Sequence, residues 1–254
     1  YKAWPGAHEL TVALALNAAL GAATVMLVYA VGRRAFGATA AMLGAAILAL
    51  FPSKIFLAGV TLTETAFTFL LMLAIWLIVE AEARRSLPVL LAAGTVIGCA
   101  ALVRGQAALL PLAAVPFWVM SDLTPSPPSL KGRGTAKAVA RAFSACLPAA
   151  ITLAVAIAIV APWTIRNAIE SDALVPISSN DGVNFYIGHS DGADGRGRKV
   201  DELVFRYAEL AQAEAEARIS RDGYREGIEW AARHPLREAE LAARKLFFLY
   251  WRDD

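Results

Sequence analysis

The uncharged stretch LTVALALNAALGAATVMLVYAV, residues 10–31, decides the fold class. It exceeds the roughly 20 apolar residues that an α-helix needs to cross a bilayer. Five further apolar segments follow, and each is continuously apolar rather than alternating, which favours helices over membrane strands. We therefore predict an all-α polytopic membrane protein with about six transmembrane helices, at residues 10–31, 38–51, 62–79, 87–103, 107–120 and 143–163.

Two of these segments, 38–51 and 107–120, are short for a span. Ile55, Phe56 and Leu57 lengthen the first of them beyond Pro52. A short helix buried inside a bundle is the alternative for either segment. Alanine and glycine are dense throughout the apolar part, and small residues of this kind favour close helix packing in membranes.

Charge divides the chain into two parts. The composition is 57% hydrophobic and only 18% charged, outside the usual range of soluble domains. Residues 1–163 hold 11 Lys and Arg against 5 Asp and Glu, whereas residues 164–254 hold 13 against 17. Because acidic side chains are costly in hydrocarbon, we predict a transmembrane bundle at 1–163 and an extracytoplasmic region at 164–254.

Basic residues in the loops predict the orientation. The turns holding Arg33-Arg34 and Arg84-Arg85 and the loop at 131–141 carry eight Lys and Arg, against four in the alternate loops. Since short cytoplasmic loops are enriched in Lys and Arg, the first set is expected inside. Residues 164–254 are then expected outside.

The region outside the bundle reads as a loop followed by helices. Residues 178–197 are rich in Gly, Asp and Asn, which predicts a turn-rich or binding loop. An apolar face at helical spacing predicts a helix over 200–232, broken at Pro235, and a second over 236–251.

Several motifs, in order along the chain, resemble bacterial membrane glycosyltransferases of the GT-C type. The family is the dolichyl-phosphate-mannose–protein mannosyltransferase superfamily, whose relatives include the aminoarabinose transferases of lipid A. The most specific string is Pro162-Trp163-Thr164-Ile165-Arg166-Asn167 followed by 175–180 and 184–195. The other matching stretches are 16–21, 28–29, 32–37, 49–52, 61–64, 103–105 with Pro111, 234–235 and 244–246.

The resemblance implies transfer of a sugar, with inversion, from a polyprenyl-phosphate carrier to an acceptor at the outer membrane face. The partners would be that donor, the bilayer and an acceptor, which in relatives is a protein, a lipid or a glycan. An Asp in the first outer loop of the family is thought to activate the acceptor hydroxyl. Residues 1–6 resemble the end of that loop, so we expect this acid upstream of Tyr1, with further helices preceding and following the chain.

Cations at the outer helix ends are the candidates for binding the donor phosphate. Arg104 and Arg166 are expected at headgroup depth, where a guanidinium can bind a phosphate bidentately. Lys54 is a third candidate. The alternative for each is a side chain that only reaches the membrane interface.

Glu64 is an acid within the apolar sequence, which makes it a candidate catalytic or metal-binding residue. The alternative is a helix cap, because Thr61-x-x-Glu64 has the spacing of a capping box. In the predicted outer loop, Asn184 and Asp191 are candidates for binding sugar hydroxyls, with a structural turn network as the alternative.

A divalent metal ion is the cofactor that some relatives use. His8, Glu64 and His189 are the candidate ligands, although the three His show no ligand spacing. The sequence contains no phosphate-binding Gly loop, nucleophile elbow or nucleic-acid motif.

Two other functions remain as alternatives. A transporter would show internal repeats and helices broken near the bilayer midplane, and Pro52 is the one clear breaker inside a segment. A non-catalytic scaffold or assembly subunit would tolerate loss of Arg104 and Arg166.

Overall fold

The structure, a computed structural model, describes residues 9–60, 62–123, 135–171, 177–178, 180–195, 203, 205–210 and 212–251. All regular elements in this part of the chain are helices. The chain divides into two compact units, 1–160 and 161–254. Each unit has its own packing.

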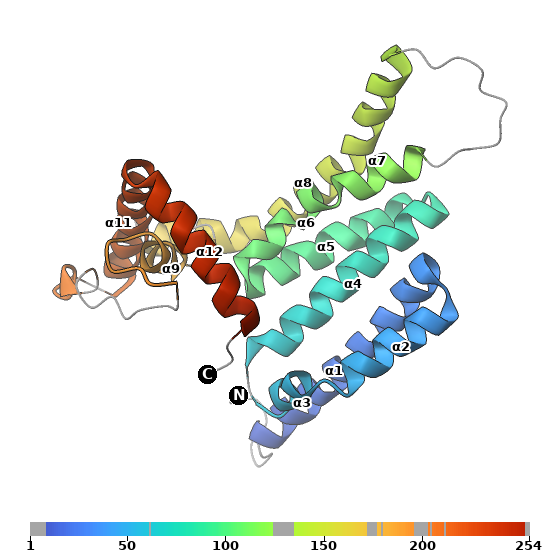
Figure 1. Ribbon diagram of the computed structural model, residues 1–254, viewed down its shortest axis with the longest axis horizontal. Coiled ribbons are helices and arrows are strands. Elements are labelled where there is room, and N and C mark those ends of the chain that lie inside the picture. Colours follow the sequence, from blue (N-terminus) through green and yellow to red (C-terminus); the bar gives the residue numbers. More distant parts are fainter. Residues whose placement is uncertain are drawn as a thin grey trace. The chain divides into compact units, whose positions relative to one another are not determined.

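The first unit is a helical bundle, shown in Figure 1. Helix α1 packs on α2 and α4, and α4 packs on α5. The elements of the first unit are α1 Glu9–Phe36, α2 Ala38–Ala49, α3 Pro52–Ala58, α4 Thr63–Arg84, α5 Leu87–Val103, the 3-10 helix η1 Gly105–Leu109, α6 Leu110–Ala113, α7 Val115–Leu123 and α8 Thr135–Ser171. Helix α8 continues into the second unit.

Three helices among the described residues are long and apolar enough to cross a membrane: Leu10–Phe36, Thr63–Arg84 and Cys146–Glu170. Helices α2 and α3 form a fourth candidate span, bent by 58°. Leu87–Val103 and Gly105–Met120 are apolar but shorter. The prediction of an all-α membrane protein is confirmed.

Local backbone chemistry explains where the helices break. Gly37 has φ +86°, which a residue without Cβ adopts easily, and it joins α1 to α2 in one residue. Pro52, which lacks an N–H group, begins α3 after the bend. The predicted segment 107–120 lies within the apolar helical stretch Gly105–Met120, which divides into η1, α6 and the first part of α7 around Pro111 and Pro116.

The core of the first unit is built from small and aliphatic side chains around Trp118. It includes Ala74 and Ile78 of α4 and Ala93 and Ile97 of α5. Helix α8 approaches α5 at two glycines: a Cβ on Gly94 would lie 2.7 Å from Val155 Cβ, and one on Gly98 2.6 Å from Ile159 Cβ. The predicted close packing at small residues therefore rests on a G-x-x-x-G pattern.

The two ends of the first unit carry different charges. At one end Arg34 Nη2 lies 2.5 Å from Glu80 Oε2, and Arg84 contacts the other oxygen of the same carboxylate. At the other end Glu64, in the first turn of α4, pairs with Arg104 at the end of α5.

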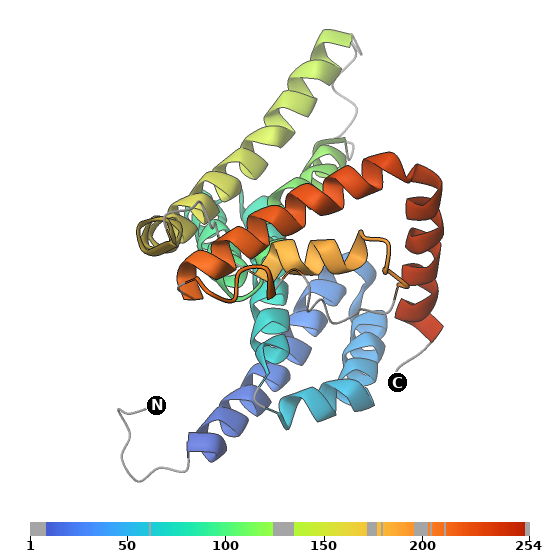
Figure 2. The same cartoon turned by 90° about the vertical axis from the view of Figure 1, so that its left-hand side faces the viewer.

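The second unit contains α9 Asn180–Gly188, α11 Gln212–Arg233 and α12 Pro235–Trp251, and Figure 2 shows α9 alongside α11.

The predicted loop at 178–197 is wrong over α9. Gly182 serves packing rather than a turn, because a Cβ there would lie 1.8 Å from Ser220 O. The predicted helix over 200–232 is wrong over 206–210, which form turns, and α11 begins at Gln212. Pro235 separates α11 from α12 as expected.

Candidate functional site

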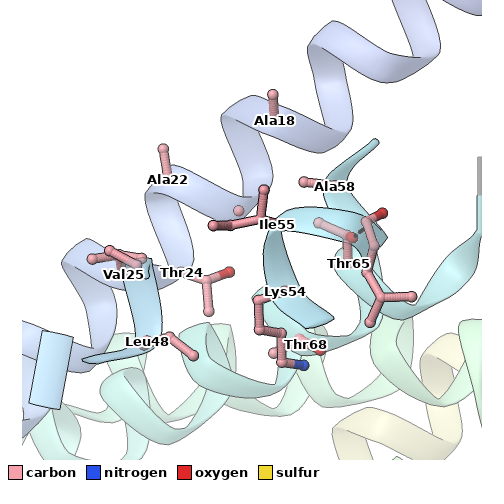
Figure 3. Close-up of a pocket in the computed structure, with 13 residues that line it drawn as sticks. Ala18, Ala22, Thr24, Val25, Leu48, Lys54, Ile55, Ala58, Thr65 and Thr68 are labelled. Carbon is pink, nitrogen blue, oxygen red and sulfur yellow. Dashed lines mark hydrogen bonds between the residues drawn. The ribbon is translucent and has the colours of Figure 1, made fainter. Parts of the chain in front are cut away.

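A cavity of about 350 Å³ lies among α1, α2, α3 and α4 (Figure 3). Its walls are mainly alanine, glycine and aliphatic side chains. The described lining residues are Ala18, Gly21, Ala22, Thr24, Val25, Leu48, Ala49, Lys54, Ile55, Leu57, Ala58, Thr65 and Thr68. The small residues of α1 leave this space open, because their side chains end at or before Cβ.

Lys54 is the one charged side chain among the described lining residues. The bend before Pro52 turns α3 toward the cavity, and Figure 3 shows the Lys54 side chain extending toward Thr68. Three threonine hydroxyls also line the space, and they donate to helix carbonyls: Thr24 to Leu20, Thr65 to Leu57 and Thr68 to Glu64. Their protons are already used, so the Lys54 ammonium is the available donor in this wall.

Glu64 and Arg104 form an ion pair across α4 and α5. Each side chain is 35% exposed, and the Arg104 guanidinium lies 5.8 Å from the centre of the Phe67 ring. Two buried polar atoms of the pair, Glu64 Oε2 and Arg104 Nε, have no hydrogen-bond partner among the described residues. Since such atoms are costly to leave unsatisfied, the pair retains capacity for another group.

The capping-box interpretation of Glu64 is wrong. Helix α4 begins at Thr63, its N-cap residue is Leu62, and no side chain among the described residues caps it. Glu64 instead turns toward Arg104, 40 positions away in sequence. Thr61, the other member of the proposed box, lies outside the described residues.

The first turns of α4 connect the ion pair with the cavity. Thr65 and Thr68 line the cavity, and the Thr68 hydroxyl donates to the Glu64 carbonyl oxygen at 2.7 Å. Lys54, Glu64 and Arg104, named separately from the sequence, therefore belong to one end of the first unit.

Arg166 lies in the second unit, near the end of α8, with partners on its own helix. Its Nη2 lies 3.0 Å from Glu170 Oε2, and its guanidinium lies 5.3 Å from the centre of the Trp163 ring. The Trp163 indole donates to Ile177 O at 3.0 Å. Because Arg166 and Glu170 are both more than half exposed, their pairing is weak and a stronger anion can displace it.

The polar candidate residues of the predicted outer loop occupy different positions in the structure and have different partners. Asn184 is exposed on α9. Asp191 follows α9, and its Oδ1 accepts a hydrogen bond from Trp230 Nε1 at 2.5 Å. His189 stacks on Phe185 with ring centres 4.2 Å apart, and its Nδ1 lies 2.9 Å from Glu238 Oε1. Trp230 and Glu238 were not singled out from the sequence.

The candidate metal ligands do not form a cluster in the described part of the chain, which contains no group of three or more His, Cys, Asp or Glu side chains able to hold a metal ion. Glu64 pairs with Arg104 and His189 with Glu238. His8 lies outside the described residues.

The chain was compared with known families and proteins. A model of the dolichyl-phosphate-mannose-protein mannosyltransferase family matches residues 6–166, more than half of the chain. The chain belongs to this family. The match contains the cavity, Glu64 and Arg104, and it ends at Arg166. No curated protein and no solved structure matches the chain.

Family membership confirms the predicted resemblance and makes the protein a membrane glycosyltransferase of the GT-C type that uses a lipid-linked sugar donor. Family membership therefore favours the glycosyltransferase over the transporter. The bend at Pro52, which a transporter would also show, here places Lys54 in the cavity wall.

Glu80 is a further charged residue that sequence reasoning missed. Arg34 and Arg84 were interpreted only as orientation signals, yet both contact this carboxylate, which is 4% exposed. An acid inside an apolar segment with Arg four positions later is a signal that could have indicated the Glu80–Arg84 pair. The contribution of Arg34 required the tertiary structure.

Proposed function

We propose that the protein transfers a sugar from a polyprenyl-phosphate carrier to an acceptor at the outer membrane face, with inversion at the anomeric carbon. One observation carries the proposal: a mainly apolar cavity in the bundle has a single charged wall residue among those described, Lys54. A polyprenyl phosphate has the matching chemistry, because its chain is apolar and its head is an anion.

The cations of this end have distinct tasks in the proposal. The Lys54 ammonium attracts the phosphate as a compact point charge, whereas Arg104 has a planar guanidinium whose Nε–H has no partner among the described residues. Glu64 pairs with Arg104 Nη2 and so orients the guanidinium. Positive charge held where the leaving phosphate accumulates negative charge lowers the barrier.

The reaction is a single displacement. The acceptor hydroxyl oxygen attacks the anomeric carbon from the side opposite the phosphate, and a glycosidic C–O bond forms while the bond to the phosphate oxygen breaks. The phosphate leaves with the electron pair, and the hydroxyl proton passes to a carboxylate. Among the described residues we assign Glu64 as candidate proton acceptor, because its Oε2 has no partner there.

The remaining assignments follow the same chemistry. Arg166, exposed and held by a weak pair with Glu170 and by the Trp163 ring, is a second phosphate ligand. Asn184 and Asp191, both exposed, contact substrate hydroxyls. We place Lys54, Arg104 and residues 164–254 on the periplasmic side of a bacterial inner membrane, with Arg33, Arg34, Arg84 and Arg85 on the cytoplasmic side.

The test uses membranes from cells that express the full chain, supplied with radiolabelled polyprenyl-phosphate hexoses and pentoses. We expect label to leave the lipid fraction, and Lys54→Ala to slow this by about 100-fold, on the scale of losing one charge-stabilising donor. Lys54→Arg should restore most of the rate because it restores the charge.

Arg33→Gln is the matched control, because Arg33 is an exposed cation near the end of α1 and belongs to the opposite end of the unit. It should transfer label like the wild type. Equal rates for Lys54→Ala and wild type, at equal expression, would remove Lys54 from the site, and unchanged label with every donor would refute the transfer reaction.

A further inference from the structure

Three polar and aromatic side chains lie together in the second unit where α11 ends. Asp191 Oδ1 accepts a hydrogen bond from the Trp230 indole at 2.5 Å, and the His234 ring stacks on Trp230 with centres 4.9 Å apart and planes 29° apart. Asp191 and His234 are exposed, and Trp230 is partly exposed. These three residues are called the Trp230 platform below.

Side chains of α12 hold the chain segment around the platform in place. Lys245 Nζ of α12 donates to Gly188 O at 2.9 Å and so satisfies a carbonyl at the end of α9. Gly188 lies three residues before Asp191. His189, which stacks on Phe185, lies 2.9 Å from Glu238 of α12. The platform therefore rests on the ends of three helices, and support of this kind orients a binding site.

The hydrogen-bonding state of His234 can be assigned from its partner. Its Nδ1 lies 2.9 Å from the Trp230 carbonyl oxygen, and because a carbonyl only accepts, Nδ1 carries the proton. In the neutral ring Nε2 then has a lone pair. Asp191 uses only Oδ1 toward Trp230. The platform thus offers acceptors beside an aromatic surface, and a ligand must bring the donors.

This combination selects a class of ligand. A phosphate or carboxylate brings acceptors and negative charge, and would be repelled by Asp191. A pyranose ring brings several hydroxyl donors on its rim and an apolar C–H face that can lie against an aromatic ring. We propose that Asp191, Trp230 and His234 bind a pyranose ring.

The assignment of this sugar to a substrate of the transfer reaction rests on the proposed function, but the site itself does not. The platform lies beyond the residues that the family model matches, 6–166. Stacking should supply much of the affinity, because the aromatic ring gives the largest contact surface of the three side chains. The hydroxyl contacts to Asp191 and His234 would set the orientation of the ring.

The experiment is saturation-transfer difference NMR on the full chain in lipid nanodiscs, with methyl mannopyranoside, methyl glucopyranoside and methyl galactopyranoside as probes. We expect saturation of ring C–H protons of at least one glycoside with the wild type. Trp230→Ala should weaken binding roughly tenfold through loss of the stacked surface. His234→Ala and Asp191→Asn should weaken it several-fold.

Arg233→Gln is the matched control, because Arg233 neighbours the platform, is exposed and forms an i,i+4 pair with Glu229. It should bind like the wild type. Should Trp230→Ala fail to fold, the exposed His234 still permits the test. No saturation with any of the three glycosides, or wild-type binding by both His234→Ala and Trp230→Ala, would overturn the proposal.

Lys54→Ala separates the sugar site from the transfer reaction. It should lose transfer yet keep glycoside binding, because Lys54 lies in the cavity of the first unit. Binding without any transfer in the wild type would remove the proposed reaction and leave the sugar site, whereas transfer without binding would remove the sugar site alone.

Discussion

Helix α4 carries Glu64 near its start and Glu80 near its end, and these two carboxylates are satisfied to different degrees. Glu80 is 4% exposed and uses both oxygens, one toward Arg34 and one toward Arg84. Glu64 is 35% exposed, pairs with Arg104 through one oxygen, and leaves the other unpartnered in the described structure. A completed network holds helices together, whereas an incomplete one leaves room for substrate. We interpret Glu80 as structural and Glu64 as functional.

The largest expected effect is the loss of stability when the ion pairs of Glu80 are removed. Arg34→Ala combined with Arg84→Ala leaves a buried carboxylate without its two partners, which should destabilise the protein by about 3–5 kcal/mol. The measurement is thermal unfolding in detergent, together with the yield of folded protein.

Adding Glu80→Gln to that double variant should recover part of the lost stability, because it removes the stranded charge. Unfolding at the wild-type temperature in the double variant would contradict the structural role of Glu80.

The second effect concerns the other end of α4. Arg104→Ala should lower kcat for transfer by about 100-fold, because it removes a donor from the departing phosphate. The unfolding temperature should change little, since an ion pair with both partners a third exposed contributes little to stability.

Arg104→Lys keeps the charge but loses the planar guanidinium, so its kcat for transfer should lie between those of Arg104→Ala and the wild type. If Arg104→Ala unfolds the protein as readily as loss of the Glu80 partners, the contrast between the two carboxylates is lost.

The smallest expected effect is on stability, and it concerns a third carboxylate, which is buried but lies outside the spanning helices. Asp222 of α11 is 5% exposed, accepts a hydrogen bond from Tyr207, and lies 3.5 Å from Arg225. Burial raises the pKa of Asp222, but the Tyr207 hydrogen bond and the charges of Arg225 and Arg221 outweigh it and hold the pKa below its ordinary value.

A lowered carboxyl pKa contributes stability above the ordinary pKa, and this stability is lost as pH falls through the lowered value. Tyr207→Phe should therefore cost about 1.5 kcal/mol at neutral pH, as for one hydrogen bond to a charged group. The difference from wild type should shrink once Asp222 is protonated, as unfolding curves between neutral pH and about pH 2 will test. A difference independent of pH would show that the Asp222 charge has no part.

Sequence reasoning succeeded where one local pattern determined the structure. The predicted segment 87–103 has the bounds of α5, because an uninterrupted apolar run lies between Ser86 and Arg104. It failed where tertiary packing overrides composition. Gly182 and Gly188 suggested a loop, yet both lie in α9, and Gly182 lets the backbone of α9 touch α11.

The candidate site shows the same division. Lys54, Glu64 and Arg104 were chosen because charges are rare in apolar sequence, and that scarcity is visible without a structure. The Glu64–Arg104 pair and the Trp230–Asp191 contact join residues 40 and 39 positions apart, and the cavity is lined by four separate helices. No local pattern contains such separations, so the helix packing had to reveal them.

The contact of Gly94 and Gly98 with α8 has a consequence for the site at the end of α5. Neither glycine has room for a methyl group, so even alanine would push the two helices apart. Arg104 lies six residues beyond Gly98, about 9 Å along the helix axis, and would be carried with that displacement. The site can thus be disabled from within the hydrocarbon core, by one added carbon atom and without altering any polar group.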